Sequence, residues 1–460
     1  MPDLETVYSK LPVVLQHAAC SLAGWRLEHG RFRGAFPRLL DEAEARSFMS
    51  QEEVRAFRDR RLQAFLWHCF ENVPFYRQRF AEAGIVPGDI DGLDDMGRLP
   101  IVTKQEAKEH LAELTPPGTS QRGKQIVHTS GTTGGGLRFL SSMSAVQEQW
   151  AVWWRYRRWH GIERGTWCGH FAGRSIVPSS QQKPPFWRYN RPGRQIIFSG
   201  YHMSPKSLPF YVEELRRRKP PWLHGYPSLL ALLAAHVLES QTELGYDVKW
   251  ITTGAENLLP QQSEIIVRAF GIRPLQHYGM AEAVANISQC DRGALHVDED
   301  FAAVEFVPRD SGTYSVVGTN FTNPFTPFVR YEVEDLLSLE PEGCTCGRPG
   351  RVVARIDGRL EDYVVLRNGT RVGRMDHVFK NVVNVREAQI HQSRPGAITI
   401  HVVRMPGYTT DDEQALLRET RKRVGDDTEV RVEYVDRVER SPIGKLRFVI
   451  SEIPEGRLER

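Results

Sequence analysis

The sequence is poor in cysteine, has no long hydrophobic run and carries no excess of one charge. Six cysteines in 460 residues are too few for a disulfide framework, so we expect a reducing, cytoplasmic environment. The longest apolar run, Leu229 to Leu238, is interrupted by His236 and is too short for a membrane span. The N-terminus lacks the pattern of a secretory signal, so we expect no targeting segment.

Charge likewise excludes one class of partner. Sixty basic residues stand against fifty-seven acidic ones, giving a formal net charge of +3, and the basic residues are scattered along the chain. Nucleic acid is therefore not an expected partner. The short basic run from Arg216 to Lys219 follows a helical pattern and is typical of a solvated helix end.

The length and the apolar patterning predict an α/β protein with two or more domains. Residues 1–115 are mainly helical in pattern. Short apolar runs that alternate with helical patterns then predict parallel α/β layers, whose ligands gather at the carboxyl ends of the strands. Period-two alternation from Ala294 to Glu340 predicts an antiparallel β region. Beyond Gly358 we expect a small unit of strands and two helices, with its clearest strands at 397–403 and 429–435.

A loop of hydroxyls and glycines follows the apolar residues 125–127. Its glycines let the backbone approach a ligand closely, and its hydroxyls suit phosphate oxygens; the loop comprises Thr129, Ser130, Gly131, Thr132, Thr133, Gly134, Gly135 and Gly136. A flexible polar loop is an equally good interpretation of this stretch alone. The Gly-Lys-Ser or Gly-Lys-Thr ending of the common NTPase phosphate loop is absent, so a lysine would have to come from elsewhere. Lys445 is one candidate, although a surface lysine on a turn is the ordinary alternative.

Six short motifs occur together in an order that resembles the adenylate-forming enzymes. The resemblance is greatest to the phenylacetate-CoA ligase branch, and within it to relatives often associated with capsular polysaccharide biosynthesis. It covers nearly the whole chain, and it rests on residues 129–134, Gly254-Ala255-Glu256, Tyr278-Gly279-Met280-Ala281-Glu282, Arg330-Tyr331 with Asp335, Gly358-Arg359-Leu360-Glu361-Asp362 and Gly444-Lys445.

The resemblance implies ATP, Mg²⁺ and CoA as cofactors and a role for each motif. The hydroxyls of residues 129–133 would bind the departing phosphates. Tyr278 and the backbone of Gly254 and Ala255 would enclose adenine, Glu282 would hold Mg²⁺, and Asp335 and Arg359 would contact the ribose. Lys445 would neutralise charge at the α-phosphate in the transition state. Each of these roles has a purely structural alternative: Tyr278 as an aromatic at a strand end, Asp335 as a turn residue, and Arg359 in an exposed ion pair with Glu361.

The resemblance also implies a mobile C-terminal domain and one departure from the family. We predict a nucleotide- and carboxylate-binding domain of residues 1–358, a hinge at 359–362 with Glu361 as pivot, and a lid of residues 363–460. Gly369 would let a pantetheine arm pass close to the backbone, although a hairpin glycine explains it equally well. Ala281 stands where the family usually has Thr or Ser, so a hydroxyl contact to the α-phosphate is lost.

Four residues make a candidate zinc site, and aromatic residues suggest the acid pocket. Cys344 and Cys346 form a Cys-x-Cys pair followed by Gly347, and Cys290 with His296 would complete a tetrahedral, structural Cys₃His set. Buried free thiols are the alternative. His224 and Tyr226, at a predicted strand end, and the tryptophans between 150 and 187 suggest an apolar pocket for an aryl or medium acyl acid. Most of these tryptophans fit core packing better.

We therefore expect an acyl-adenylate-forming ligase that transfers the acyl group most simply to CoA. A second hypothesis sends the acyl group to an amine or hydroxyl, such as a sugar or a carrier protein. A third is a degenerate nucleotide-binding scaffold, against which the retention of Glu282, Asp335, Arg359 and Lys445 argues. The acid and the oligomeric state stay open.

Overall fold

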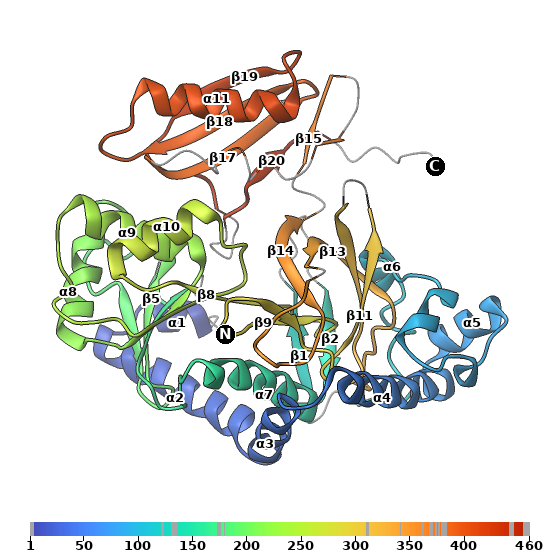
Figure 1. Ribbon diagram of the computed structural model, residues 1–460. Coiled ribbons are helices and arrows are strands. Elements are labelled where there is room, and N and C mark those ends of the chain that lie inside the picture. Colours follow the sequence, from blue (N-terminus) through green and yellow to red (C-terminus); the bar gives the residue numbers. More distant parts are fainter. Residues whose placement is uncertain are drawn as a thin grey trace. The chain divides into compact units, whose positions relative to one another are not determined.

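The computed structural model is a mixed α/β protein, as the sequence predicts, and it divides into two compact units. The first unit comprises Met1–Leu22, Thr166–Leu275 and Gly358–Arg460, and the second comprises Ala23–Gly165 and Gln276–Asp357. The structure describes residues 4–120, 124–129, 137–172, 176–178, 180–309, 312–340, 342–359, 363–367, 371–372, 375, 378, 384–440 and 446–453. Figure 1 labels the main elements.

The first unit contains a parallel sheet and a smaller mixed sheet. Strands β5, β3, β6 and β7 lie side by side in parallel, and β4 pairs antiparallel with β5. The bounds of the elements up to residue 275 are α1 (Leu4–Ser9), α2 (Val13–Phe32, which continues into the second unit), β3 (Cys168–Ala172), β4 (Trp187–Asn190), β5 (Gln195–Ser199), η3 (Gly200–His202), α8 (Leu208–Arg218), β6 (Trp222–Gly225), α9 (Pro227–Glu239), β7 (Trp250–Thr253) and α10 (Pro260–Phe270).

The C-terminal part of the first unit has its own hydrophobic core. Here β17 pairs antiparallel with β18, while β19 and β20 join the two edges in parallel. Helix α11 lies against this sheet (Figure 1). It begins with a capping box between Thr409 and Asp412 and buries Leu416 among the apolar residues of the sheet. The elements are β15 (Val364–Val365), β16 (Arg371–Val372), β17 (Val385–Arg394), β18 (Ala397–Arg404), α11 (Thr410–Val424), β19 (Glu429–Tyr434) and β20 (Val449–Ser451).

The second unit combines helices with an antiparallel sheet, as the period-two pattern predicts. Its strands follow the order β11-β12-β13-β14-β10-β9-β8, and a separate hairpin joins β1 to β2. The elements are α3 (Phe36–Arg46), α4 (Gln51–Asn72), α5 (Pro74–Ala83), η1 (Pro87–Asp89), η2 (Leu93–Arg98), α6 (Lys104–Glu109), β1 (Gln125–His128), β2 (Arg138–Ser141), α7 (Met143–Trp159), β8 (Leu275–Gly279), β9 (Asn286–Gln289), β10 (Leu295–Val297), β11 (Ala303–Pro308), β12 (Tyr314–Thr319), β13 (Tyr331–Leu339) and β14 (Val352–Arg359).

Local sequence signals explain several element ends. Ser50 caps α4 and exchanges hydrogen bonds with Glu53, which satisfies amide groups that the first turn leaves without partners. Pro74 stands at the first position of α5, where the missing N–H costs nothing. The chain therefore breaks its helical pattern at Val73, between two helices.

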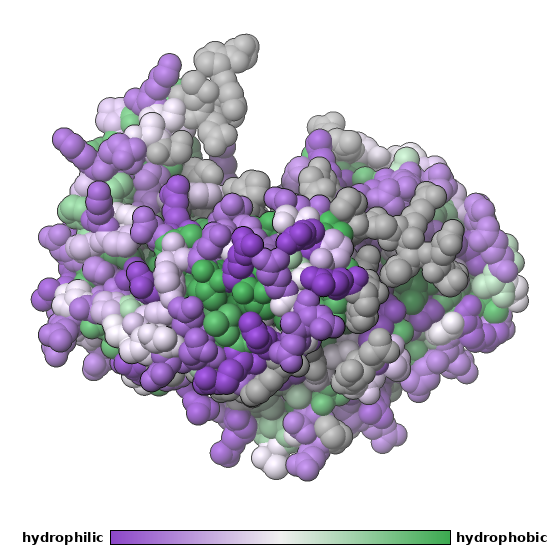
Figure 2. Space-filling view, turned by 90° about the horizontal axis from the view of Figure 1, so that it is seen from above, coloured by the Kyte–Doolittle hydropathy of each residue, from purple (hydrophilic) through white to green (hydrophobic). Residues whose placement is uncertain are grey.

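The apolar run that the sequence places between Leu229 and Leu238 is a buried helix. It forms most of α9, and ten of the residues of that helix are buried. Eight of these ten residues pack in a core with residues of β3, β5 and α8. No helix among the described residues has the length and the apolar character needed to cross a membrane. Figure 2 shows a face that is mainly hydrophilic, with hydrophobic residues gathered in limited areas.

Candidate functional site

Two residues of the predicted nucleotide site lie together at the end of strand β8. The hydroxyl of Tyr278 donates a hydrogen bond to Oδ2 of Asp335 on β13, at 2.7 Å. The two residues are 57 positions apart in the sequence, and the antiparallel sheet of the second unit brings them into contact. The bond holds the Tyr278 ring by its polar tip, and the ring also packs against the hydrophobic core of the second unit.

The residues after Tyr278 form a half-buried turn. Gln149 of α7 donates to the carbonyl of Met280 at 2.8 Å, and Asn320 donates to the carbonyl of Glu282 at 2.7 Å. Ala281 lies in the same turn. Backbone contacts from two other elements thus hold this segment, and the structure does not test the roles that we predict for Glu282 and Ala281.

The predicted phosphate loop is carried by the β1–β2 hairpin. Residues His128 and Arg138 pair across the strands, and beyond them Thr129 and Leu137 close the hairpin with two hydrogen bonds. The amide of Thr129 donates to the carbonyl of Leu137 at 2.9 Å, and Oγ1 of Thr129 accepts from the amide of Leu137 at 2.8 Å. Thr129 therefore pins the base of the loop, while Ser130, Gly131, Thr132, Thr133 and Gly134 lie outside the described residues.

In the first unit, the motif Gly254-Ala255-Glu256 follows strand β7. Ala255 has a φ of 66°, a left-handed conformation that costs free energy for a residue with a Cβ. The carboxylate of Glu256 accepts hydrogen bonds from the amides of Ser228, at 3.2 Å, and Leu446, at 2.8 Å. Burial raises the pKa of Glu256, and the nearby guanidinium of Arg440 opposes that shift.

Of the predicted acid-pocket residues, His224 lies near the end of strand β6, and Tyr226 follows the strand at the start of α9. Thr252 on the neighbouring strand lies 2.8 Å from Nδ1 of His224 and accepts from the indole N–H of Trp222 at 2.8 Å. The Thr252 hydroxyl therefore contacts two side chains of strand β6, Trp222 and His224. Gly225 between His224 and Tyr226 is required, because a Cβ there would lie 2.0 Å from the carbonyl oxygen of Phe171.

Several predicted site residues cannot be placed. Lys445, Glu361 and Gly369 lie outside the described residues. Arg359 ends strand β14, and only its backbone is described. Their predicted roles stay predictions.

The four predicted zinc ligands converge in the second unit. The donor atoms of Cys290, His296, Cys344 and Cys346 all lie within 4.8 Å of one another. The sulfurs of Cys290 and Cys344 are 3.8 Å apart, and the sulfur of Cys346 is 3.3 Å from Nε2 of His296. In a tetrahedral site with Zn–S bonds of about 2.3 Å, two sulfurs lie about 3.8 Å apart.

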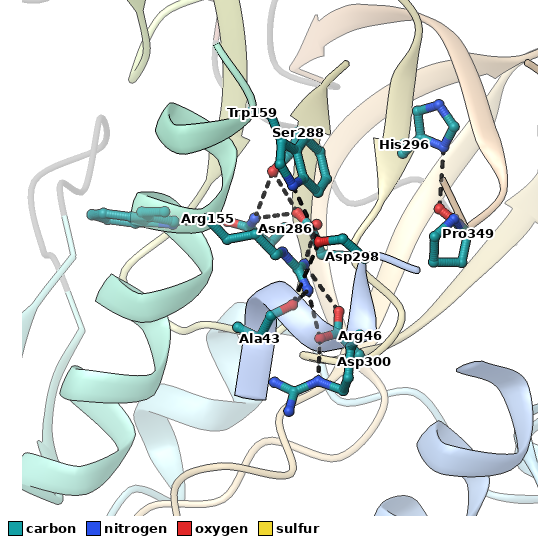
Figure 3. Close-up of polar contacts among 12 residues, drawn as sticks. Ala43, Arg46, Arg155, Trp159, Asn286, Ser288, His296, Asp298, Asp300 and Pro349 are labelled. Atoms are coloured by element: carbon teal, nitrogen blue, oxygen red, sulfur yellow. Dashed lines mark hydrogen bonds and ion pairs between the residues drawn. The ribbon is translucent and has the colours of Figure 1, made fainter. Parts of the chain in front are cut away.

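The other nitrogen of His296 supports the same arrangement. Nδ1 lies 3.1 Å from the carbonyl oxygen of Pro349, which can only accept, so Nδ1 carries the proton (Figure 3). The lone pair of Nε2 is then directed at the cysteines. A backbone carbonyl that orients a ligating histidine in this way is common in metal sites.

Sequence reasoning missed a buried ionic network in the second unit. Arg155 of α7 donates to Oδ1 of Asp298 at 2.6 Å and to Oδ2 of Asp300 at 2.7 Å, and Arg46 of α3 adds a bond to Asp300 at 2.6 Å (Figure 3). All four side chains are at least nine-tenths buried. No sequence motif predicts this network, because the partners lie more than a hundred positions apart in the chain. The run Asp298-Glu299-Asp300 after an apolar strand was the only signal in the sequence.

The two aspartates of this network have opposite pKa shifts. For Asp298 burial dominates and raises the pKa, although Arg155 opposes it. For Asp300 burial also acts to raise the pKa, but the charges and hydrogen bonds of Arg155 and Arg46 outweigh it and hold the pKa below its usual range. Two guanidiniums face Asp300 and one faces Asp298, which accounts for the difference.

Comparisons with known proteins relate this chain to CapK and to the phenylacetate-CoA ligases. The family model described as "CapK C-terminal domain" matches residues 364–452. Protein CapK of Staphylococcus aureus is 24% identical over 456 residues, covering 98% of this chain and 100% of that protein. The phenylacetate-coenzyme A ligase of Thermus thermophilus is 24% identical over 351 residues, covering 69% of this chain and 73% of the ligase.

Solved structures agree in fold. The crystal structure of 2-hydroxyisobutyryl-CoA ligase in the postadenylation state superposes with a TM-score of 0.69 at 20% identity, covering 88% of this chain and 91% of that one. An open conformation of the same ligase gives a TM-score of 0.56. The predicted fold class is thereby confirmed.

Proposed function

We propose that this chain, a homologue of CapK and of the phenylacetate-CoA ligases with the fold of the adenylate-forming ligases, is an acid–thiol ligase. It would join a carboxylic acid to the AMP part of ATP, release pyrophosphate, and then transfer the acyl group to CoA. Within the structure, the observation that carries the proposal is the hydrogen bond from Tyr278 to Asp335. It brings together the two side chains that the resemblance assigns to adenine and to ribose.

In the proposed first step, a carboxylate oxygen attacks the α-phosphorus of ATP and the bond to the β-phosphate oxygen breaks, which frees pyrophosphate. The β1–β2 hairpin would present its hydroxyls to the departing phosphates, with Thr129 holding the base of the loop. Lys445 would offset the negative charge that builds at the α-phosphate. In the second step the CoA thiolate attacks the acyl carbon and AMP leaves, so positioning and electrostatics supply the catalysis.

We propose the following residues for the ion, the nucleotide and the acid that this chemistry needs. Glu282 carries an oxygen ligand of the kind that Mg²⁺ prefers, on a turn whose backbone is held by Asn320. Bound there, Mg²⁺ would neutralise phosphate charge. The peptide groups at Gly254 and Ala255 would enclose the other face of adenine. His224 and Tyr226 would line the acid pocket, and Arg359 would contact the ribose.

We also propose that Cys290, His296, Cys344 and Cys346 hold a structural Zn²⁺. The donor set, the sulfur separation of 3.8 Å and the histidine tautomer support this assignment. Four protein ligands leave no open position, so the ion would stabilise the fold without taking part in the reaction. Elemental analysis of protein purified without added metal should find about one zinc per chain, and the absence of zinc would leave three free thiols and a histidine.

For the acceptor of the acyl group, one observation favours a second candidate. The similarity to CapK covers 98% of the chain, whereas the similarity to the ligase of Thermus thermophilus covers 69%. The family model for the C-terminal domain of CapK also matches the region that we propose as the acceptor-binding lid. The alternative is therefore adenylation followed by transfer to an amine or hydroxyl, such as that of a sugar or a carrier protein.

A pyrophosphate-release screen over a panel of carboxylic acids tests the proposal, first without CoA and then with it. We expect release with a subset of acids and an acyl-CoA product when CoA is present; an acyl-adenylate that CoA does not consume would favour the second acceptor class. Lys445→Ala should abolish pyrophosphate exchange with an active acid, with exposed Lys206→Ala as the matched control. No release with any acid would identify a nucleotide-binding scaffold instead, and unchanged exchange in Lys445→Ala would overturn the mechanism.

A further inference from the structure

Asn286 lies at the centre of a buried hydrogen-bond network that reaches the candidate nucleotide site. It is the first residue of β9 and has no exposed surface. Its Oδ1 accepts from the indole N–H of Trp153 at 2.8 Å and lies 2.9 Å from Nε2 of His277. Its Nδ2 donates to Oδ2 of Asp298.

The partners fix both the orientation of the amide and the protonation of His277. The indole can only donate and the carboxylate can only accept, so the amide oxygen must face Trp153 and the amide nitrogen must face Asp298. His277 must then donate from Nε2. Burial and the charge of Arg157 lower the pKa of His277 to about 3, so the ring is neutral near pH 7 and keeps its single proton on Nε2.

The acidic side of the network anchors this amide firmly. Asp298 also accepts from Arg155 at 2.6 Å and from the hydroxyl of Ser288 at 2.7 Å (Figure 3). Arg155 is held in turn by Asp300. Each of these side chains is buried, so the hydrogen bonds of Asp298 hold the amide of Asn286 in a fixed position.

On its other side the amide lies against both neighbours of Tyr278. Asn286 pairs with Gly279 across the β8–β9 ladder, and a Cβ on Gly279 would lie 2.8 Å from Oδ1 of Asn286. The same Cβ would lie 3.1 Å from the ring of His277. The glycine of the Tyr278-Gly279 motif is thus explained by the space that the Asn286 amide occupies.

We propose that Asn286 is a positioning residue for the nucleotide: its amide joins Asp298 to His277 and packs over Gly279, and so fixes the strand end that carries Tyr278. This inference rests on the proposed function, because it takes adenine to be the group that Tyr278 meets. Asn286 itself touches no reacting atom. It acts by holding β8 in the conformation that aims the Tyr278 ring toward adenine while Asp335 holds its hydroxyl.

The test uses the full-length chain with AMP as the probe and three variants. Asn286→Ala removes the amide, Gly279→Ala displaces it, and Ser288→Ala removes a different hydrogen bond to the same Asp298 as the matched control. ¹⁵N NMR of the histidine rings reports the His277 tautomer, and calorimetry reports the Kd for AMP. Circular dichroism confirms that each variant is folded.

We expect Asn286→Ala and Gly279→Ala each to weaken AMP binding about tenfold or more and to abolish the fixed Nε2–H tautomer of His277. The double variant should be little worse than either single one, because both changes remove the same interaction. Ser288→Ala should keep the tautomer and bind AMP within about twofold of the wild type.

The outcomes separate this inference from the proposed function. A folded Asn286→Ala that binds AMP like the wild type, or that keeps the His277 tautomer, overturns the inference alone. If Asn286→Ala is too unstable to study, Gly279→Ala decides the question in the same way. A wild-type chain that binds no AMP and releases no pyrophosphate overturns the proposed function and this inference with it.

Discussion

Two polar clusters of the second unit lie next to each other in the sequence and have opposite electrostatic character. His296 belongs to the Cys₃His cluster, and Asp298 and Asp300, a few residues later, belong to the buried ionic network. In the network, each buried carboxylate already has guanidinium partners at hydrogen-bond distance. In the Cys₃His cluster, the described donor atoms converge mainly on one another.

The comparison teaches how a buried polar group shows whether it needs a ligand. A buried carboxylate that already accepts hydrogen bonds from guanidinium groups needs no further ligand, and for Asp300 the two guanidiniums outweigh the effect of burial. Electron-pair donors that face one another across a metal-sized space are incomplete without a cation. The ionic network therefore serves structure and positioning, whereas the convergence of donor atoms in the Cys₃His cluster supports the proposed metal site.

The largest expected effect on stability comes from replacing Arg155, the central cation of the ionic network. Arg155→Met should lower the free energy of unfolding by about 3–5 kcal/mol, because it leaves Asp298 and Asp300 buried with fewer partners. Urea unfolding followed by circular dichroism measures the change. The matched control is Arg158→Ala on the same helix, whose ion pair with Glu44 is about one-third exposed and should contribute less than about 1 kcal/mol. Similar losses in both variants would remove the distinction between the two clusters.

The second largest effect on stability is expected from a substitution in the Cys₃His cluster. Cys344→Ser should abolish zinc binding and lower the free energy of unfolding by about 2.7 kcal/mol, the stabilisation that a ligand supplies at a hundred times its Kd. Metal analysis and thermal unfolding, each with and without a chelator, measure this. Cys20→Ser, outside the cluster, should keep both the zinc and the chelator-sensitive stability. A chelator without effect on the wild type would show that the cluster is complete without a metal.

The smallest effect is the pH dependence of the network. The folded-state pKa of Asp300 lies below its unfolded value of about 3.9, so its stabilisation is present above that value and is lost as the pH falls toward the folded pKa. Stability should decline from about pH 5 downward, because protonation of Asp300 removes its attraction to the guanidiniums of Arg155 and Arg46. Asp298, whose pKa is raised, contributes with the opposite sign. Asp300→Asn should show a flatter pH profile, and an unchanged profile would mean that Asp300 is not the group that responds.

Motifs that act through a short stretch of chain could be recognised from the sequence, whereas supports assembled from distant residues could not. The spacing around Tyr278 and the Cys-x-Cys pair both pointed to residues that the fold brings together with distant partners, Asp335 and Cys290. Asn286, Arg155 and Asp298 carried no comparable signal. An asparagine or an arginine is usually exposed, and nothing in the local pattern shows that these two are buried.

The amino-acid sequence by itself determined the α/β class, the helix and strand periodicities, the family resemblance and the candidate ligands, because these depend on neighbouring residues and on the order of motifs. Only the tertiary structure decided which polar side chains lose their water and which partners replace it. That outcome depends on the packing of strands β8–β10 against helix α7, which brings Trp153 and Arg155 to Asn286 and Asp298. Desolvation gives these contacts their strength, and desolvation is a property of the folded chain.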